Sequence, residues 1–306
     1  MAESGCKCGF AMVHGSLSKF RQYFRGLARA VIAGLSLATS DNAGEAISGA
    51  DAAAPVLNAR EVRRFPVPDA FQGVAVNAHA FYAISNTQIT KYDKASGRRL
   101  ANWSDPSGDI VHLNSCAIRK AILVCAHSNY PDSPARSSIE IFDTATLKHV
   151  GHRSLGITPG ALTWAAWHEG AWWLCYATYG GFAQDPYKAG SSTTIVRYDE
   201  RWRRRRRETW LFPTSVLNSF GAMSASGGAW GPGHYLYVTG HDRPELYVLR
   251  LPESGSVLRH VATIIIPGHG QAFGWDPTQP RILYSIDRAL RAIIVVRVPP
   301  IPTQEQ

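Results

Sequence analysis

Three segments of this 306-residue chain end in the same way, and this internal repetition constrains the fold more than any other feature. They read TQITKYD (87–93), SSIEIFD (137–143) and TTIVRYD (193–199). In each, apolar and polar residues alternate up to a final Asp, the pattern of a half-buried β-strand that enters a turn. An apolar stretch precedes each segment, and a stretch rich in small residues precedes that one. Each repeat therefore predicts at least three successive strands.

The spacing of the repeats predicts five units. In four units the residue that opens the small-residue strand, polar in the first three, lies ten positions before the centre of the next strand. The pairs are Gln72 and Tyr82, Asn114 and Val124, Thr163 and Trp173, and Gly227 and Tyr237. A fifth unit, 270–298, keeps the same order of strands with a longer first hairpin. Units of about 40–65 residues with several short strands are typical of β-propeller blades.

The sequence thus predicts an all-β fold, a five-bladed β-propeller of four-stranded antiparallel blades over residues 59–300. The last unit lacks a fourth strand, and we expect the N-terminal strand 59–68 to supply it and close the ring. Closure would also remove exposed sheet edges. We expect residues 45–58 to be a linker and 301–306 a tail.

The chain resembles bacterial exported β-propellers of the five-bladed glutamine-cyclotransferase-like and YVTN-type group. The resemblance rests on FQGVAV (71–76), IEIFD (139–143), LYVTGHD (236–242) and GQAFGW (270–275), and it covers roughly residues 59 to 300. Close relatives in this group often carry the label cycloisomerase, so the resemblance implies lactone or cyclic-amide chemistry. Because propellers host many unrelated functions, it supports the architecture more strongly than the chemistry.

Residues 1–44 have the pattern of an export signal. An apolar run, 30–38, ends in a small-residue cleavage site and follows basic residues at Lys19, Arg21, Arg25 and Arg29. Initiation at Met12 would give the segment a more usual length. We expect a periplasmic or secreted bacterial protein; an Arg-rich organelle transit peptide is the alternative. No apolar run reaches transmembrane length.

Polar residues recur at one end of the predicted blades. In a propeller the start of each innermost strand and the end of the second strand open onto the same face, so these side chains should meet at the mouth of the central channel. We expect them to bind a small polar molecule. The predicted ligand-binding residues are Gln72, His112, Asn114, Asn129, Tyr130, Thr163, Trp164, Tyr176, Tyr179, Ser226, Gln271 and Asp287. The alternative is that they only satisfy strand ends and ordered water.

Histidines supply the candidate catalytic groups. His127 or His241 is the expected general base because histidine titrates near neutral pH. Asp242 or Asp287 would orient the base or stabilise charge; the alternative for both aspartates is that they cap turns. His112, His127 and His241 would also suit a divalent metal, but their spacing matches no metal motif, so no cofactor is firmly predicted. The connection 177–192 is expected to form a flap over the mouth.

Five adjacent arginines, Arg203 to Arg207, supply much of the net charge of +9 and at first suggest a nucleic-acid site. Basic pairs recur, however, five and six positions after Asp93, Asp143 and Asp199. The run therefore predicts an outer blade strand, whose charge discourages edge-to-edge pairing. No specific nucleic-acid partner is predicted; weak, salt-sensitive contact with an anionic surface through Arg203, Arg204, Arg205, Arg206 and Arg207 stays open.

Two classes of function remain open at this stage. The first is an exported propeller that binds a small polar ligand at its mouth, with lyase, cyclase or lactonase chemistry by a His/Asp acid–base pair. The second is a non-catalytic scaffold that binds a partner protein. The cysteines add little, because an odd number in the body of the chain argues against a full disulfide framework.

Overall fold

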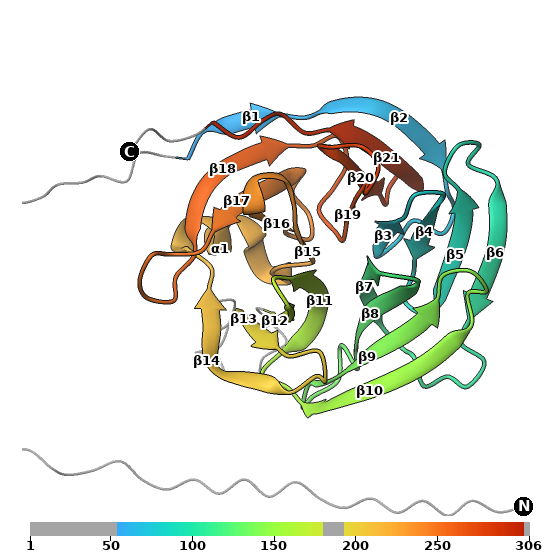
Figure 1. The fold of residues 1–306 in the computed structure, drawn as a ribbon, viewed down its shortest axis with the longest axis horizontal. Coiled ribbons are helices and arrows are strands. Elements are labelled where there is room, and N and C mark those ends of the chain that lie inside the picture. Colours follow the sequence, from blue (N-terminus) through green and yellow to red (C-terminus); the bar gives the residue numbers. More distant parts are fainter. Residues whose placement is uncertain (1–53, 180–192, 303–306) are drawn as a thin grey trace, which may run out of the picture. The chain divides into compact units, whose positions relative to one another are not determined.

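The computed structural model describes residues 54–179 and 193–302. The predicted export signal, and the part of the predicted flap from residue 180 to 192, lie outside these described residues. Within them the chain forms five β-sheets arranged as a ring, each with four antiparallel strands and one with an added fifth strand (Figure 1). The prediction of a five-bladed, all-β propeller is confirmed.

The first three blades follow the repeats in order, each with its strands paired from the channel outward. Blade 1 contains β3 (Gly73–Val76), β4 (Ala80–Ile84), β5 (Gln88–Asp93) and β6 (Arg99–Ser104). Blade 2 contains β7 (Leu113–Arg119), β8 (Ile122–Ser128), β9 (Arg136–Asp143) and β10 (His149–Ile157). Blade 3 contains β11 (Ala161–His168), β12 (Ala171–Ala177), β13 (Thr194–Tyr198) and β14 (Arg204–Leu211).

The last two blades take strands from both ends of the described chain. Blade 4 contains β15 (Gly227–Trp230), β16 (Leu236–Thr239), β17 (Glu245–Arg250) and β18 (Arg259–Ile265), and β1 (Val56–Asn58) pairs with β18 in parallel. Blade 5 contains β19 (Gly274–Trp275), β20 (Ile282–Asp287), β21 (Ala292–Arg297) and, as its outer strand, β2 (Arg60–Pro66). The N-terminal strand therefore closes the ring as expected. β1 lies in the segment expected to be a linker.

The hydrophobic core is divided among the five seams between blades. Each cluster of buried side chains combines residues of two neighbouring blades. At the seam between blades 5 and 1, Phe65 of β2 packs against Phe81 with ring centroids 5.0 Å apart. At the seam between blades 3 and 4, Trp164 lies against Gly228, where a Cβ atom would come within 2.4 Å of the indole. A larger residue than glycine does not fit there.

The arginine run lies where the repeats predict it. Outer strand β14 begins at Arg204, as β6, β10 and β18 begin at Arg99, His149 and Arg259. Carboxylates neutralise part of the positive charge on and around this strand. Arg203 contacts the Asp199 carboxylate at 2.7 Å, and Arg197 contacts Glu208 at 3.2 Å. The arginines thus belong to the rim of blade 3.

Three further features were not expected from the repeats. A disulfide joins Cys116 of β7 to Cys125 of β8, and Cys175 is a buried free thiol. A short helix, α1 (Thr214–Phe220), connects blades 3 and 4 and buries Val216 and Phe220 in the seam. None of the described helices is long and apolar enough to cross a membrane.

Candidate functional site

A cavity of about 510 Å³ opens at the face where the innermost strands begin. We call it the mouth cavity. All five blades or the loops beside them contribute to its lining, which consists of Gln72, Asn86, Val111, His112, Asn114, Tyr130, Pro131, Tyr179, Met223, Ser226, His241, Gln271 and Arg288. Most of the predicted binding residues thus come together, because each lies near the start of an inner strand or just after the end of a second strand, at the same end of its blade.

Amide side chains of the mouth cavity are held in fixed orientations. Gln72 donates from Nε2 to Oδ1 of Asn86 at 2.6 Å, and Asn114 donates from Nδ2 to the carbonyl oxygen of Leu162 at 3.0 Å. Gln271 is only 3% exposed and has a φ of 134°, in a region that glycine favours. Such backbone strain costs about 1–3 kcal/mol and concentrates at functional sites. The cavity floor is therefore preorganised.

One wall of the cavity is aromatic. The His112 and Tyr130 rings lie 5.1 Å apart, and the Tyr130 and Tyr179 rings 4.9 Å apart. Burial, helped by the nearby His127, lowers the pKa of His112 to about 4. Burial also raises the pKa of Tyr179 above its ordinary value. Both side chains are uncharged at neutral pH and offer hydrogen bonds to a ligand.

Arg288 places a positive charge in this cavity. Its guanidinium lies over the Phe71 ring, 4.1 Å from the centroid, and its Nη1 lies 2.9 Å from Nε2 of His241. Burial and the neighbouring Arg291 lower the pKa of Arg288 somewhat, but an arginine stays protonated at neutral pH. A partly buried guanidinium of this kind suits a carboxylate or a phosphate.

The hydrogen bonds of His241 define its tautomer. An arginine can only donate, so Nε2 of His241 accepts from Arg288, and the ring proton lies on Nδ1. Nδ1 donates it to the carboxylate of the exposed Asp242. The predicted pairing of His241 with Asp242 is therefore present, but Arg288 occupies the lone pair that a general base would use.

His127 lies behind the cavity wall and does not line it. Its Nε2 accepts the backbone N–H of Val111 at 3.2 Å, and its Nδ1 lies 2.8 Å from Oγ of Ser138, which in turn donates to Glu140 at 2.6 Å. Burial lowers the pKa of His127, against the raising effect of Glu140. Both ring nitrogens are thus engaged, Nε2 by the loop that carries Val111 and His112 and Nδ1 by Ser138 of β9.

The remaining predicted residues lie elsewhere. Thr163 and Trp164 are buried in the inner strand of blade 3 and its seams, and the Tyr176 hydroxyl bonds that of Tyr198 at 2.8 Å. Asn129 closes its own loop, with Oδ1 accepting from the N–H of Arg136 at 2.7 Å. Asp287 accepts the N–H of Leu290 at 3.0 Å in a turn. None of these five side chains lines the mouth cavity.

Arg288 is the main group that the sequence reasoning missed. It directly follows Asp287, the last residue of β20, and successive residues at a strand end point to different sides. The repeat pattern indicated Asp287 as the polar residue of this strand end, whereas Arg288 beside it lines the cavity. Val111, Pro131 and Met223 carry no polar signal that would have marked them.

The three candidate metal ligands His112, His127 and His241 do not form a group. Among the residues that the structure describes, the set of three close ligand atoms is instead His168, Glu169 and His234, on the opposite face of the ring.

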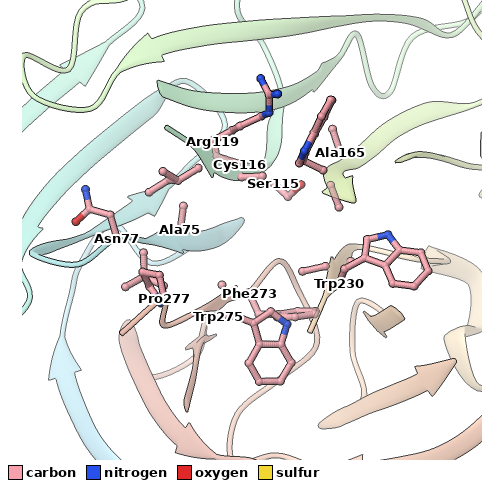
Figure 2. A pocket seen from close by; sticks show the side chains of 18 of the residues that line it. Ala75, Asn77, Ser115, Cys116, Arg119, Ala165, Trp230, Phe273, Trp275 and Pro277 are labelled. Atoms are coloured by element: carbon pink, nitrogen blue, oxygen red, sulfur yellow. The ribbon is translucent and has the colours of Figure 1, made fainter. Parts of the chain in front are cut away.

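A second cavity, of about 580 Å³, opens at that opposite face, where the hairpins between first and second strands lie. We call it the hairpin-side cavity. Small residues of the inner strands, such as Ala75, Ser115 and Ala165, line its depth, while Trp230, Trp275 and Arg119 stand around it (Figure 2). The indole N–H groups of Trp230 and Trp275 are buried without a hydrogen-bond partner in the described structure.

The ring of blades and its polar mouth define the class of this protein as a five-bladed β-propeller with a candidate ligand site. In fold it is similar to a glutaminyl cyclase of Myxococcus xanthus, with a TM-score of 0.56 at 8% identity over 80% of this chain and 97% of that one. The expected resemblance to glutaminyl cyclase propellers is confirmed at the level of the fold.

Two other solved structures are less similar. A luciferin-regenerating enzyme gives a TM-score of 0.45 at 10% identity over 78% of this chain and 94% of that one. The Cps50 (Swd1) propeller domain of Myceliophteria thermophila gives 0.43 at 10% identity over 79% and 99%. No protein-family model and no curated protein sequence matches the chain.

Proposed function

We propose that this protein binds a small anionic molecule in the mouth cavity. The observation that carries the proposal is Arg288, a partly buried guanidinium fixed on Phe71 and surrounded by amide, hydroxyl and imidazole groups from the other blades. A carboxylate or phosphate would take two parallel hydrogen bonds from Arg288. Gln72, Asn114 and Ser226 then supply donors and acceptors for the polar remainder of the ligand.

The same binding mode would prepare His241 for acid–base chemistry. An anion that draws Arg288 away leaves Nε2 of His241 free, with Nδ1–H still oriented by Asp242. A neutral imidazole so held is a general base of the kind that lactone hydrolysis or the cyclisation of an amide needs. The likeness in fold to a glutaminyl cyclase makes glutaminyl peptides one substrate class to test, beside lactones of hydroxy acids.

The test is calorimetric titration with a panel of small carboxylates, phosphate, hydroxy-acid lactones and glutaminyl peptides. The informative variant is Arg288→Gln, and its matched control is Arg291→Gln, because Arg291 also lies over Phe71 but bonds the Pro68 carbonyl and does not line the cavity. We expect an anion to bind the wild type, with at least about tenfold weaker binding to Arg288→Gln, since a charged hydrogen bond contributes roughly 1.5–3 kcal/mol.

The outcomes separate the classes of function. Turnover of a panel member that is lost in His241→Gln assigns an enzyme, and binding without turnover assigns a binding protein. If no anion binds, or if Arg291→Gln weakens binding as much as Arg288→Gln, the proposal fails and the non-catalytic scaffold takes its place.

We also propose that the chain is exported to the periplasm or beyond. The Cys116–Cys125 disulfide supports this, because disulfides persist in oxidising compartments and are rare in the cytosol. The apolar run 30–38 behind basic residues gives the same indication from the sequence. The thiol state of both cysteines in the chain recovered from its source is the measurement that checks it.

A further inference from the structure

Two histidines and a glutamate meet on the face opposite the mouth cavity. His168 is the last residue of β11, Glu169 follows it in the turn to β12, and His234 lies in the connection between β15 and β16. One ligand atom of each side chain lies within 4.8 Å of those of the other two. The cluster therefore joins the first hairpins of blades 3 and 4, and Trp167, the neighbour of His168, lines the hairpin-side cavity.

The three side chains make up a donor set that transition metals prefer. Two imidazole nitrogens and one carboxylate oxygen bind Zn²⁺ at about 2.0–2.2 Å, and three protein ligands leave a coordination position for water or a small anion. Tetrahedral angles at such bond lengths hold neighbouring ligand atoms about 3.4 Å apart. Nε2 of His168 and Oε1 of Glu169 already lie at 3.5 Å.

To coordinate one metal ion, the three ligand atoms have to move closer together, and the exposed side chains of the cluster can make this movement. The Glu169 side chain is 65% exposed, and His234 is exposed as well, so both can change rotamer without disturbing the core. His168 supplies the fixed point. Its ring stacks on the Trp230 indole with centroids 3.9 Å apart and an interplanar angle of 11°.

The turns that carry the ligands adopt backbone conformations that these residues rarely take. Glu169 has a φ of 46° and His234 a φ of 58°, each in the left-handed region where glycine or asparagine is usual. Arg197, whose charge acts on His168, is paired with Glu208 at 3.2 Å. This pairing offsets part of the repulsion that Arg197 would exert on a metal ion.

We propose that His168, Glu169 and His234 form a binding site for a divalent transition metal, with Zn²⁺ the best match to the donor set. The bound ion links blade 3 to blade 4 across their seam. This site lies on the other face of the ring from Arg288, so it is independent of the ligand proposed for the mouth cavity.

The test is titration of the tag-free full chain with Zn²⁺ alone, after removal of metals with a chelator. All proteins carry Cys6→Ser and Cys8→Ser, because thiolates also bind zinc. The variants are His234→Ala and Glu169→Gln, with His79→Ala as the matched control, since His79 is an exposed histidine in a first hairpin that lines the same cavity. Circular dichroism verifies that each variant is folded.

We expect one equivalent of Zn²⁺ to bind the parent protein. Loss of an outer-shell partner already weakens metal sites by about 10–100-fold, so His234→Ala, which removes a ligand, should weaken binding by at least tenfold. Glu169→Gln should weaken it less, and His79→Ala should leave it unchanged. Absence of zinc binding by the parent protein, or unchanged binding by folded His234→Ala, overturns the proposal.

Discussion

Burial keeps several histidines of the propeller neutral. It lowers the pKa of His112 to about 4, with His127 adding to the effect, and it lowers the pKa of His127 and His260 as well. In an unfolded chain histidine titrates near pH 6.5. Between these values the unfolded chain binds more protons than the native one, so the free energy of unfolding falls as the pH falls from about 6.5 toward 4.

His112→Gln should reduce this sensitivity to acid. Glutamine keeps a hydrogen-bonding group in the cavity wall but removes a histidine whose pKa is lowered to about 4. We expect the urea midpoint of the wild type to drop more between pH 7.5 and pH 4.5 than that of the variant. His79→Gln, a change at an exposed hairpin, serves as the control. Equal drops in wild type and His112→Gln would contradict the argument.

For single residues, the sequence predicted many of the side chains that line the mouth cavity but not what each of them does there. The start and end of strands are visible in a repeat, so Gln72, His112 and Gln271 could be placed together. Trp164 could not be placed, because its position depends on Gly228 of the next blade, which leaves room for the indole. Arg288 could not be chosen over Asp287, because one residue of register at a strand end decides which side chain faces the cavity.

Among the elements, the β7–β8 hairpin is the one with a covalent link. Cys116 and Cys125 face each other across the two strands and are nine positions apart in the sequence. The hairpin borders the hairpin-side cavity and contributes Cys116 and Cys125 to the core of the seam between blades 1 and 2. Closing a loop of this length is worth about 2–3 kcal/mol in the chain-entropy description.

The double variant Cys116→Ser, Cys125→Ser should therefore be less stable by about 2–3 kcal/mol. Urea unfolding followed by tryptophan fluorescence measures the change. Reductant should bring the wild type close to the variant and leave the variant unaffected, which serves as the internal control. Ready alkylation of both thiols in the chain taken from its source without reductant would count against the disulfide and against export.

For the rim strand β14, comparison with the other repeats changes the interpretation of the arginine motif. Taken alone, five arginines indicate nucleic acid, whereas the equivalent positions of the other blades are basic as well. Pairing of β14 with β13 places the run on the outside of blade 3. Contact of these arginines with an anionic surface stays a prediction.

For the whole molecule, stability depends on seams that join neighbouring blades. Repetition in the sequence predicted the number of blades, because each unit carries its own alternation of apolar and polar residues. It could not predict the contents of the seams, which combine side chains from separate repeats, nor helix α1, which has no counterpart in the described parts of the other units. The periodicity of the sequence thus predicted the fold class but not the packing of side chains in the seams.

Phe65→Ala tests the seam that closes the ring. Phe65 is 4% exposed and packs on Phe81. Its truncation should therefore lower the free energy of unfolding by about 3–5 kcal/mol, as for other buried phenylalanines. In a domain of this size the melting temperature should fall by about 6–20 °C, measured by calorimetry. Val62→Ala on the same strand is the control, because Val62 is 50% exposed and should change little. Similar effects of both changes would show that β2 does not hold the ring.

The pairing of β1 with β18 and of β2 with β21 has a consequence for the making of the protein. The first described strands to be synthesised have as partners two of the last ones, so they wait unpaired while more than two hundred residues are added. A chain that stops before residue 292 lacks β21 and has no partner for β2. Such a chain keeps unpaired strand edges, which favour aggregation and degradation. The pairing of β2 thus requires a chain that includes the last blade.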